Sequence, residues 1–262
     1  MGYFDKKSSM TIRALSHAAE MAQKYGTESS TSACLTTIYS PSFNPPLVDG
    51  KPSRIQVVDA DSVGAAFAEY SQNRSQWYKP CILNFASYKN PGGKFLEGST
   101  AQEESLCHES NLYNILEKLD KTYYLPHRGK GMSNRALYAN EALFSPDVIF
   151  SHDNVTLKFD VLTCAAPNYA AASRYYDVTS KENAEVLYDR IIFLRKILET
   201  NNVKTVILGA FGCGVFGQDP NLVASYMNQI FQNSSIDTII YAIPKNLNER
   251  NYIAFKNRIA ET

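Results

Sequence analysis

The stretch Asn90-Pro91-Gly92-Gly93-Lys94-Phe95-Leu96-Glu97-Gly98-Ser99-Thr100-Ala101-Gln102-Glu103-Glu104 decides how this chain is interpreted. An apolar run at residues 81–86 precedes it and is typical of a short buried strand. Residues 105–119 follow with apolar side chains at helical spacing, which predicts a helix. Glycines between a strand and a helix let a ligand approach backbone N–H groups closely. We therefore expect a site that places two adjacent carboxylates beside a ligand.

The same residues have a purely structural interpretation. Thr100 and Glu103 match a capping box, in which each side chain bonds the backbone N–H of the other residue at a helix start. A capping box explains neither Glu104 nor the upstream glycines. The local pattern alone leaves both interpretations open.

Length and composition exclude several classes of function. The chain has 262 residues, of which 20% are charged and 44% hydrophobic, and its formal net charge is zero. It is long enough for a substantial core, and its balance of charges gives no global field that favours nucleic acid or an anionic membrane. No apolar stretch approaches the roughly 20 residues of a membrane span, and residues 1–10 lack the apolar run of a signal peptide. We expect neither membrane nor direct nucleic-acid binding.

The cysteines predict a reducing environment. Five are scattered without a Cys-x-x-Cys pair, at Cys34, Cys81, Cys107, Cys164 and Cys213. Such thiols are expected to be reduced and buried in a cytosolic or nuclear protein. Neither the cysteines nor the four histidines show zinc-ligand spacing, so no metal site is predicted.

Hydrophobic periodicity predicts helices and strands that alternate along the chain. Helices are expected at residues 9–24, 61–70, 180–200, 222–231 and 248–259, and strands at residues 34–39, 55–58, 148–150, 159–163, 203–208 and 236–243. Thr179 and Glu182 match a second capping box, and Asp219-Pro220 is typical of an N-cap followed by proline. The alternation predicts an α/β fold with helices on both faces of a sheet. We expect one domain over residues 1–262, with a core at about 51–262 and an N-terminal helical extension at about 1–50.

A second glycine-rich loop, at residues 212–217, follows the predicted strand at 203–208 and matches the pattern G-x-G-x-x-G. A dinucleotide-binding fold begins with such a loop and places an acidic residue at the end of the next strand, where this chain has Pro244 and Lys245. That fold is therefore not expected. Glycines before a helix start still favour a bound diphosphate, and Phe216 is either a core aromatic or a ligand contact.

Residues 90–104 resemble the signature of poly(ADP-ribose) glycohydrolases, a glycine triplet followed by Gln-Glu-Glu, and their flanks resemble the microbial-type branch. Three further segments agree with the family in order, at residues 145–150, 164–168 and 209–220. The resemblance covers most of the chain. It implies a three-layer macrodomain-like fold, with a mixed central sheet and helices on both faces.

The resemblance also implies an activity and a site. Carboxylates would hydrolyse the ribose–ribose O-glycosidic bond of poly(ADP-ribose) and release ADP-ribose, with no metal and no other cofactor. Glu104 would be the general acid and then the base that activates water, and Glu103 would hold ribose hydroxyls. The implied ligand contacts are Asn84, Gly92, Gly93, Gln102, Gly212, Cys213, Gly214, Val215 and Phe216.

Lys94 departs from the family, because it stands where the third glycine is expected. It either obstructs a position that needs a positive φ, or directs its ammonium toward the diphosphate of the ligand. Two alternatives therefore stay beside poly(ADP-ribose) cleavage: a hydrolase of mono-ADP-ribosylated protein or another ADP-ribose conjugate, and a non-catalytic ADP-ribose-binding module. On each interpretation we expect a monomer in the cytoplasm or nucleus that binds poly(ADP-ribose) or ADP-ribosylated proteins.

Overall fold

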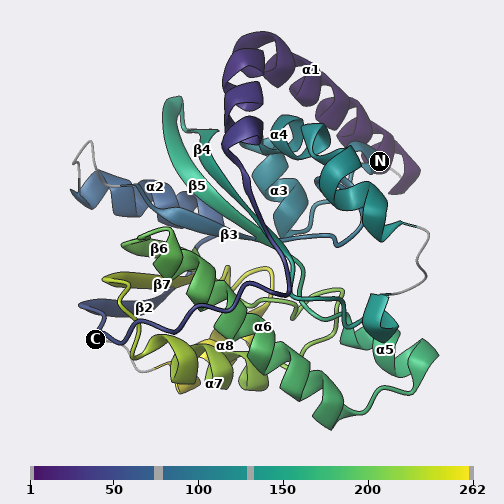
Figure 1. The fold of residues 1–262 in the computed structure, drawn as a ribbon. Helices are drawn as coiled ribbons and strands as arrows, with labels where there is room; N and C mark the ends of the chain where they lie inside the picture. The colour runs from purple at the N-terminus through teal and green to yellow at the C-terminus, as the bar shows by residue number, and fades with distance from the viewer. Residues whose placement is uncertain (1–2, 74–78, 129–132, 260–262) are drawn as a thin grey trace.

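A seven-stranded mixed sheet forms the centre of the molecule (Figure 1). The computed structural model describes residues 3–73, 79–128 and 133–259. The strands lie in the order β1-β4-β5-β3-β6-β7-β2, and β4 runs antiparallel to both of its neighbours. Their bounds are β1 (Thr37–Tyr39), β2 (Arg54–Val58), β3 (Cys81–Phe85), β4 (Ala142–His152), β5 (Val155–Cys164), β6 (Thr205–Leu208) and β7 (Thr238–Ala242).

Helices cover both faces of this sheet, as the sequence predicted. Side chains from α6, α7 and α8 pack on one face, and side chains from α1, α2, α3 and α4 pack on the other. The helices are α1 (Tyr3–Leu35), α2 (Ser62–Asn73), α3 (Gln102–His108), α4 (Leu112–Lys118), α5 (Tyr169–Tyr176), α6 (Ser180–Thr200), α7 (Pro220–Phe231) and α8 (Glu249–Arg258). None of the helices in the described ranges is long and apolar enough to cross a membrane.

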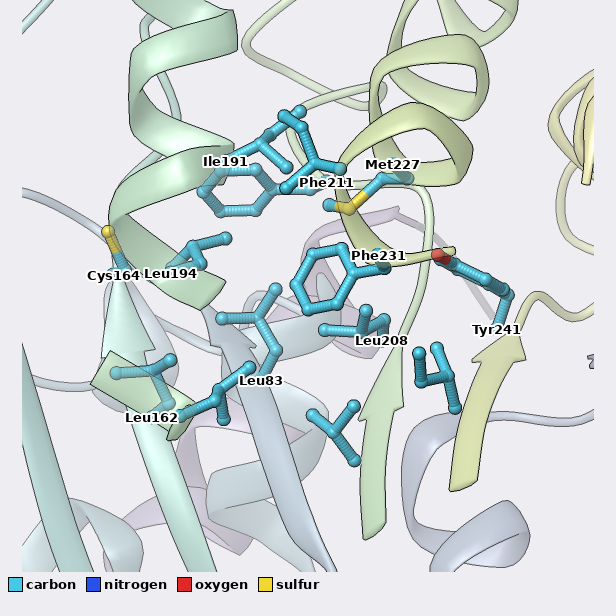
Figure 2. Packing of buried hydrophobic residues seen from close by; sticks show 14 of the residues in the cluster. Leu83, Leu162, Cys164, Ile191, Leu194, Leu208, Phe211, Met227, Phe231 and Tyr241 are labelled. Atoms are coloured by element: carbon cyan, nitrogen blue, oxygen red, sulfur yellow. The ribbon is translucent and has the colours of Figure 1, made fainter. Parts of the chain in front are cut away.

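The alternation of side chains along the strands divides the core into two layers. In β3, Leu83 belongs to the cluster beneath α6 and α7, whereas Ile82 belongs to the cluster beneath α2, α3 and α4. Figure 2 shows the first layer, in which Leu194 of α6 and Phe231 of α7 lie over Leu83. The central strands are thus buried on both faces, which explains why they appear in the sequence as continuous apolar runs.

The N-terminal part of the chain is more regular than predicted. Helix α1 extends to Leu35 with a kink at Tyr25, so the expected strand at residues 34–39 shortens to β1. Side chains of α4 and of the turn before it bond this helix: Asn114 donates to the carbonyl of Ala18 over 3.0 Å, and Asn111 donates to Ser29 Oγ over 3.0 Å. These long-range contacts override the weak helix propensity of the serine-rich end of α1.

The helix predicted over residues 105–119 is two helices, α3 and α4. The backbone between them pairs with β4: Ser151 N–H donates to the carbonyl of Glu109 over 2.8 Å, and Asn111 N–H donates to the carbonyl of Ile149 over 3.1 Å. Backbone groups at 109–111 that bond a strand are not free to continue a helix. The sheet therefore breaks a helix that the apolar periodicity predicted as continuous.

The two predicted capping boxes have different outcomes. At α6 the Thr179 hydroxyl and the Glu182 carboxylate exchange both bonds, so this prediction is confirmed. At α3 the N-cap is Ala101, and among the described residues no side chain caps the helix start, so the prediction for Thr100 and Glu103 is wrong. The carboxylate of Glu103 lies instead against the loop after β3.

Candidate active site

A cavity of about 540 Å³ opens at the carboxyl end of β3. Its wall comes from the loop after β3, the first turn of α3, the segment after β5 and the glycine-rich loop between β6 and α7. The parallel strands β5, β3 and β6 are neighbours, so these loops meet at one edge of the sheet. Ligands of open α/β sheets bind at such an edge.

Glu103 and Glu104 occupy the first turn of α3, where only 3% and 5% of their surface is exposed. Glu103 is held at both oxygens, because Ser87 N–H donates to Oε2 over 2.7 Å and Asn84 Nδ2 donates to Oε1 over 3.3 Å. Glu104 Oε1 accepts a hydrogen bond from Lys94 N–H over 2.9 Å. Glu104 Oε2 is buried without a hydrogen-bond partner among the described residues. One carboxylate oxygen of the pair is thus without a hydrogen bond, in a residue that lines the cavity.

The protonation of the pair follows from its surroundings. Burial raises the pKa of Glu103 to about 8. The charge on Glu104 also raises it, whereas hydrogen bonds from Ser87, Asn84 and Gly92 lower it. Two carboxyl groups in one buried turn repel each other when both are charged. The pair therefore retains about one proton near neutral pH.

Gly93 lies directly against both carboxylates. A Cβ at this position would lie 2.6 Å from Glu104 Oε1 and 2.9 Å from Glu103 Oε2. Its φ of +60° is also one that glycine adopts without strain. Gly92 has φ +65°, and a Cβ there would lie 2.9 Å from Tyr113 Cδ2 on α4. Gly93 is thus required by the carboxylate pair, and Gly92 by packing beneath the loop.

Position 94 does not require the glycine that the family pattern has there. The φ of Lys94 is −111°, an ordinary value for a residue with a side chain. Its N–H holds Glu104, while its side chain is 68% exposed and lies at the cavity rim. The obstruction that a positive φ would cause is therefore absent.

Two predicted ligand contacts bond other parts of the site. Gln102 Oε1 accepts from Phe85 N–H over 2.8 Å, and its Nε2 donates to the carbonyl of Leu83 over 2.9 Å. Gln102 thereby fixes the start of α3 to the end of β3, although its side chain also borders the cavity. Asn84 is fully buried between Glu103 and Thr163 and is not among the lining residues. The structure places it behind the carboxylate rather than at the cavity surface.

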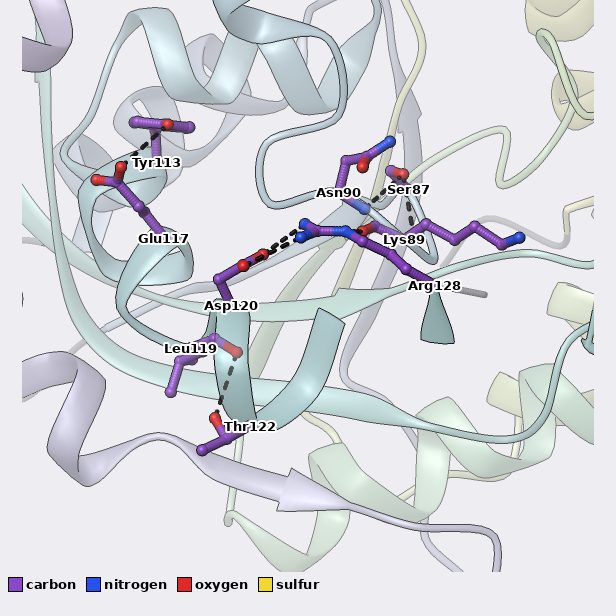
Figure 3. A network of polar contacts seen from close by, with 9 residues as sticks. All are labelled: Ser87, Lys89, Asn90, Tyr113, Glu117, Leu119, Asp120, Thr122 and Arg128. Atoms are coloured by element: carbon purple, nitrogen blue, oxygen red, sulfur yellow. Dashed lines mark hydrogen bonds and ion pairs between the residues drawn. The ribbon is translucent and has the colours of Figure 1, made fainter. Parts of the chain in front are cut away.

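The loop that holds Glu103 is itself anchored (Figure 3). Ser87 Oγ accepts a hydrogen bond from Asn90 N–H over 3.2 Å, which closes the turn. Arg128 Nε donates to the carbonyl of Lys89 over 2.8 Å, and its guanidinium pairs with both oxygens of Asp120. Arg128 thus ties this loop to the segment after α4.

The second glycine loop forms the opposite wall. Gly212, with φ +76°, leaves no room for a side chain, since a Cβ there would lie 2.7 Å from Ala166 Cβ. Gly214 differs, because a Cβ there meets nothing within 4 Å among the described residues. Packing therefore explains glycine at 212 but not at 214. Beyond the loop, Asp219 caps α7 by accepting from two backbone N–H groups, as predicted.

Two of the three remaining residues predicted on this loop face the cavity. Val215 is 83% exposed and lines the wall. Phe216 also lines the wall and lies 6.1 Å from the ring of Tyr138, centroid to centroid. Cys213 is not among the lining residues, and its thiol donates to the carbonyl of Phe211 beneath the loop.

An aromatic stack that the sequence did not indicate closes one side of the cavity. The rings of Tyr88 and Tyr138, which both line it, stack at 4.4 Å between centroids, and His127 stacks on the far side of Tyr88 at 4.2 Å. Glu141 accepts from the Tyr88 hydroxyl and pairs with His127 Nε2 at 2.7 Å. The His127 hydrogen bond accordingly lowers the pKa of Glu141. These residues come from separate segments, so no local pattern predicts their contact.

A second cavity, of about 400 Å³, continues the first along the edge of the sheet. The two share six lining residues, namely Phe85, Ala101, Gln102, Ala210, Gly214 and Val215. The second cavity extends toward Asp61 at the start of α2 and Leu247 after β7. Together the two cavities form an elongated hollow.

A comparison with protein-family models gives a match over the part of the chain that carries the two carboxylates. A family model for the catalytic domain of microbial-type poly(ADP-ribose) glycohydrolase matches residues 7–153. The chain belongs to this family. No curated protein sequence matches it.

Solved structures of poly(ADP-ribose) glycohydrolases extend the likeness to nearly the whole chain. The enzyme from Thermomonospora curvata is 25% identical, with a TM-score of 0.82, and the match covers 96% of this chain and 100% of that one. Its complex with the inhibitor ADP-HPD matches over the same shares with a TM-score of 0.83. A T267R mutant of the Deinococcus radiodurans enzyme, in complex with ADP-ribose, is 25% identical with a TM-score of 0.77, covering 88% of this chain and 96% of that one.

In this glycohydrolase-family chain the fold gathers most of the predicted site residues at one cavity. The lining includes Gly93, Gln102, Glu103, Glu104, Gly212, Gly214, Val215 and Phe216, and does not include Asn84, Gly92 and Cys213. Within the described parts of the chain, no group of three or more His, Cys, Asp or Glu side chains is arranged to hold a metal ion.

Proposed function

We propose that this chain hydrolyses the ribose–ribose O-glycosidic bond of poly(ADP-ribose) and releases ADP-ribose. The observation that carries the proposal is the buried pair Glu103 and Glu104 in the wall of an elongated cavity. Glycoside hydrolysis requires a carboxylic acid that protonates the departing oxygen and a base that activates water. Membership in the glycohydrolase family supports the same reaction.

The substrate would span both cavities. The glycine loop would hold the diphosphate of the terminal unit, since Gly214 is exposed and lines the cavity on the loop that precedes α7. The nucleoside would enter the second cavity, and the distal ribose would lie against Glu103 and Glu104. The free side of Gly214, which packing does not require, is consistent with close approach of a ligand.

The hydrogen bonds support different roles for the two carboxyl groups. Ser87 N–H and Asn84 Nδ2 are donors, so they favour the charged form of Glu103. Glu104 Oε2, which has no hydrogen-bond partner among the described residues, would carry the proton that the reaction transfers. Glu104 would donate this proton to the departing ribose oxygen and later take one from the attacking water. Glu103 would hold ribose hydroxyls and stabilise the oxocarbenium-like transition state.

We infer that the substrates are poly(ADP-ribose) chains or ADP-ribosylated proteins, and that the protein acts as a monomer in the cytoplasm or nucleus. The buried free thiols of Cys81, Cys107 and Cys164 support a reducing compartment.

Glu104→Gln tests the proposal, with Glu185→Gln on the exposed face of α6 as a matched control. Because glutamine cannot transfer the proton, release of ADP-ribose from poly(ADP-ribose) should fall by at least a hundredfold, which is the lower end of general acid–base contributions. The control should keep wild-type release. Binding of ADP-ribose, measured by calorimetry, should persist in both variants. Wild-type protein that binds ADP-ribose but releases none would favour a non-catalytic binding module and contradict the proposal.

A further inference from the structure

Four charged residues line the first cavity in the described part of the chain: Lys89, Lys94, Glu103 and Glu104. The two glutamates form the buried pair, so positive charge comes from the two lysines on the loop after β3. The chain has no net charge that attracts a polyanion from a distance. Recognition of an anionic substrate at this end of the cavity therefore depends on local cations.

Lys94 combines a fixed backbone with a loosely held side chain. Its N–H is bonded to Glu104 Oε1, which places the residue beside the proposed general acid. Its ammonium lies 3.8 Å from Glu97, and both side chains of this pair are more than 60% exposed. An exposed ion pair at this distance contributes little to stability. The ammonium is thus available to a competing anion.

The lining residues show on which side of the carboxylates Lys94 lies. The second cavity borders Gln102 and the glycine loop but not Lys89, Asn90 or Lys94. These three residues line the first cavity only. A substrate with its nucleoside in the second cavity and its distal ribose at Glu104 would therefore place its scissile bond next to Lys94. The departing portion of the substrate would leave along this rim.

We propose that Lys94 determines specificity for polymer by binding the diphosphate of the ADP-ribose unit that departs. The proposal rests on the proposed function, and it assigns to Lys94 a phosphate other than the one held by the glycine loop. In poly(ADP-ribose) the departing oxygen belongs to another ADP-ribose unit, which carries two phosphates. An ammonium binds phosphate as a point charge and tolerates variation in geometry. A substrate whose departing group is uncharged would gain nothing from Lys94.

Lys94→Met tests this inference, because methionine keeps the backbone N–H that bonds Glu104 and removes the charge. The matched control is Lys181→Met, which removes a charge at the exposed start of α6. Two substrates are compared: poly(ADP-ribose), and ADP-ribose joined to serine in a peptide without acidic residues. The polymer-to-peptide ratio of kcat/KM should fall about two- to fivefold in Lys94→Met, the range of one exposed charge contact, and stay constant in the control. The change should appear in KM for polymer.

A second variant predicts the opposite change. Glu97→Gln removes the carboxylate that competes for Lys94, so KM for polymer should fall. The slope of log(kcat/KM) against log[salt] for polymer should also decrease in magnitude by about 0.7 in Lys94→Met, as for one phosphate contact on a single-stranded polyanion. An equal loss on both substrates, or an unchanged ratio in Lys94→Met, would overturn the inference. Absence of ADP-ribose release by the wild type would instead refute the proposed function.

Discussion

At the scale of single residues, the site depends on close contacts between the first glycine-rich loop and the two buried glutamates. Gly93 gives the buried carboxylates their space, and Lys94 N–H next to it orients Glu104. Gly214 on the opposite wall has free space where a side chain would be. Glycine at these two positions therefore has different physical reasons: packing of the site requires Gly93, and we propose that access of the ligand requires Gly214.

Substituting alanine at each of the two glycines distinguishes packing of the site from access of the ligand. Gly93→Ala introduces strain at φ +60° and a contact with both carboxylates, so we expect a loss of about 1–3 kcal/mol in unfolding free energy and a large fall in kcat. Gly214→Ala should leave stability within about 0.5 kcal/mol and raise KM, because its Cβ enters space proposed for the ligand. Chemical denaturation and steady-state kinetics measure both effects. Wild-type kcat in Gly93→Ala would contradict this account of the carboxylate pair.

At the scale of elements, identical sequence patterns have different outcomes where tertiary contacts compete. Thr179 caps α6 as its local sequence predicts, whereas Glu103 is drawn away from the start of α3 by Ser87 N–H. The departure from the local rule falls at the proposed active site, where a side chain serves the ligand rather than its own helix.

Removing each threonine tests this difference. Thr179→Ala should lower the unfolding free energy by about 1 kcal/mol, since it deletes a cap that bonds Glu182 N–H over 3.2 Å. Thr100→Ala should have an effect below about 0.5 kcal/mol, because the Thr100 side chain does not cap α3. Equal losses in the two variants, measured by urea denaturation, would show that Thr100 does cap the helix in solution.

Sequence predicted those elements whose pattern is local. Strand β3, the Thr179 cap of α6 and the Asp219 cap of α7 lie where apolar runs and capping residues indicated. Sequence did not predict the break between α3 and α4, which comes from pairing with β4, or the full length of α1. The cavity likewise combines residues that the sequence predicted with contacts that it did not. Glu103 and Glu104 stand in a recognisable motif, but the Tyr88–Tyr138 stack is formed by residues 50 positions apart that only the fold brings together.

At the scale of the whole molecule, the N-terminal segment is built into the fold. Strand β1 pairs with β4 at one edge of the sheet, and α1 packs over α4 (Figure 1). Ala14 of α1 is fully buried in the same cluster as Leu106 of α3 and Ile115 of α4. We therefore predict that the chain unfolds as one cooperative domain in spite of its helical extension.

Ala14→Leu tests whether the chain unfolds as one domain, because the larger side chain does not fit the packed space between α1 and the core. The added methyl groups should cost about 1–3 kcal/mol and shift a single unfolding transition to lower temperature. Circular dichroism and calorimetry should report the same midpoint for the wild type and, at a lower value, for the variant. Two transitions, with only one of them shifted by the substitution, would mean that the N-terminal segment folds separately.

The pH profile of ADP-ribose release from poly(ADP-ribose) tests the central claim most directly. The claim is that a buried carboxyl pair carries one proton at neutral pH and delivers it to the departing ribose. Because the pKa of Glu103 is raised to about 8, chiefly by burial, the pair loses its proton as pH rises through that value. We predict that kcat falls above about pH 8, approaching tenfold for each further unit, and that release by Glu104→Gln is at least a hundredfold slower than wild type at neutral pH. A kcat that stays constant from pH 6 to pH 10, or release by Glu104→Gln at the wild-type rate, would contradict the account.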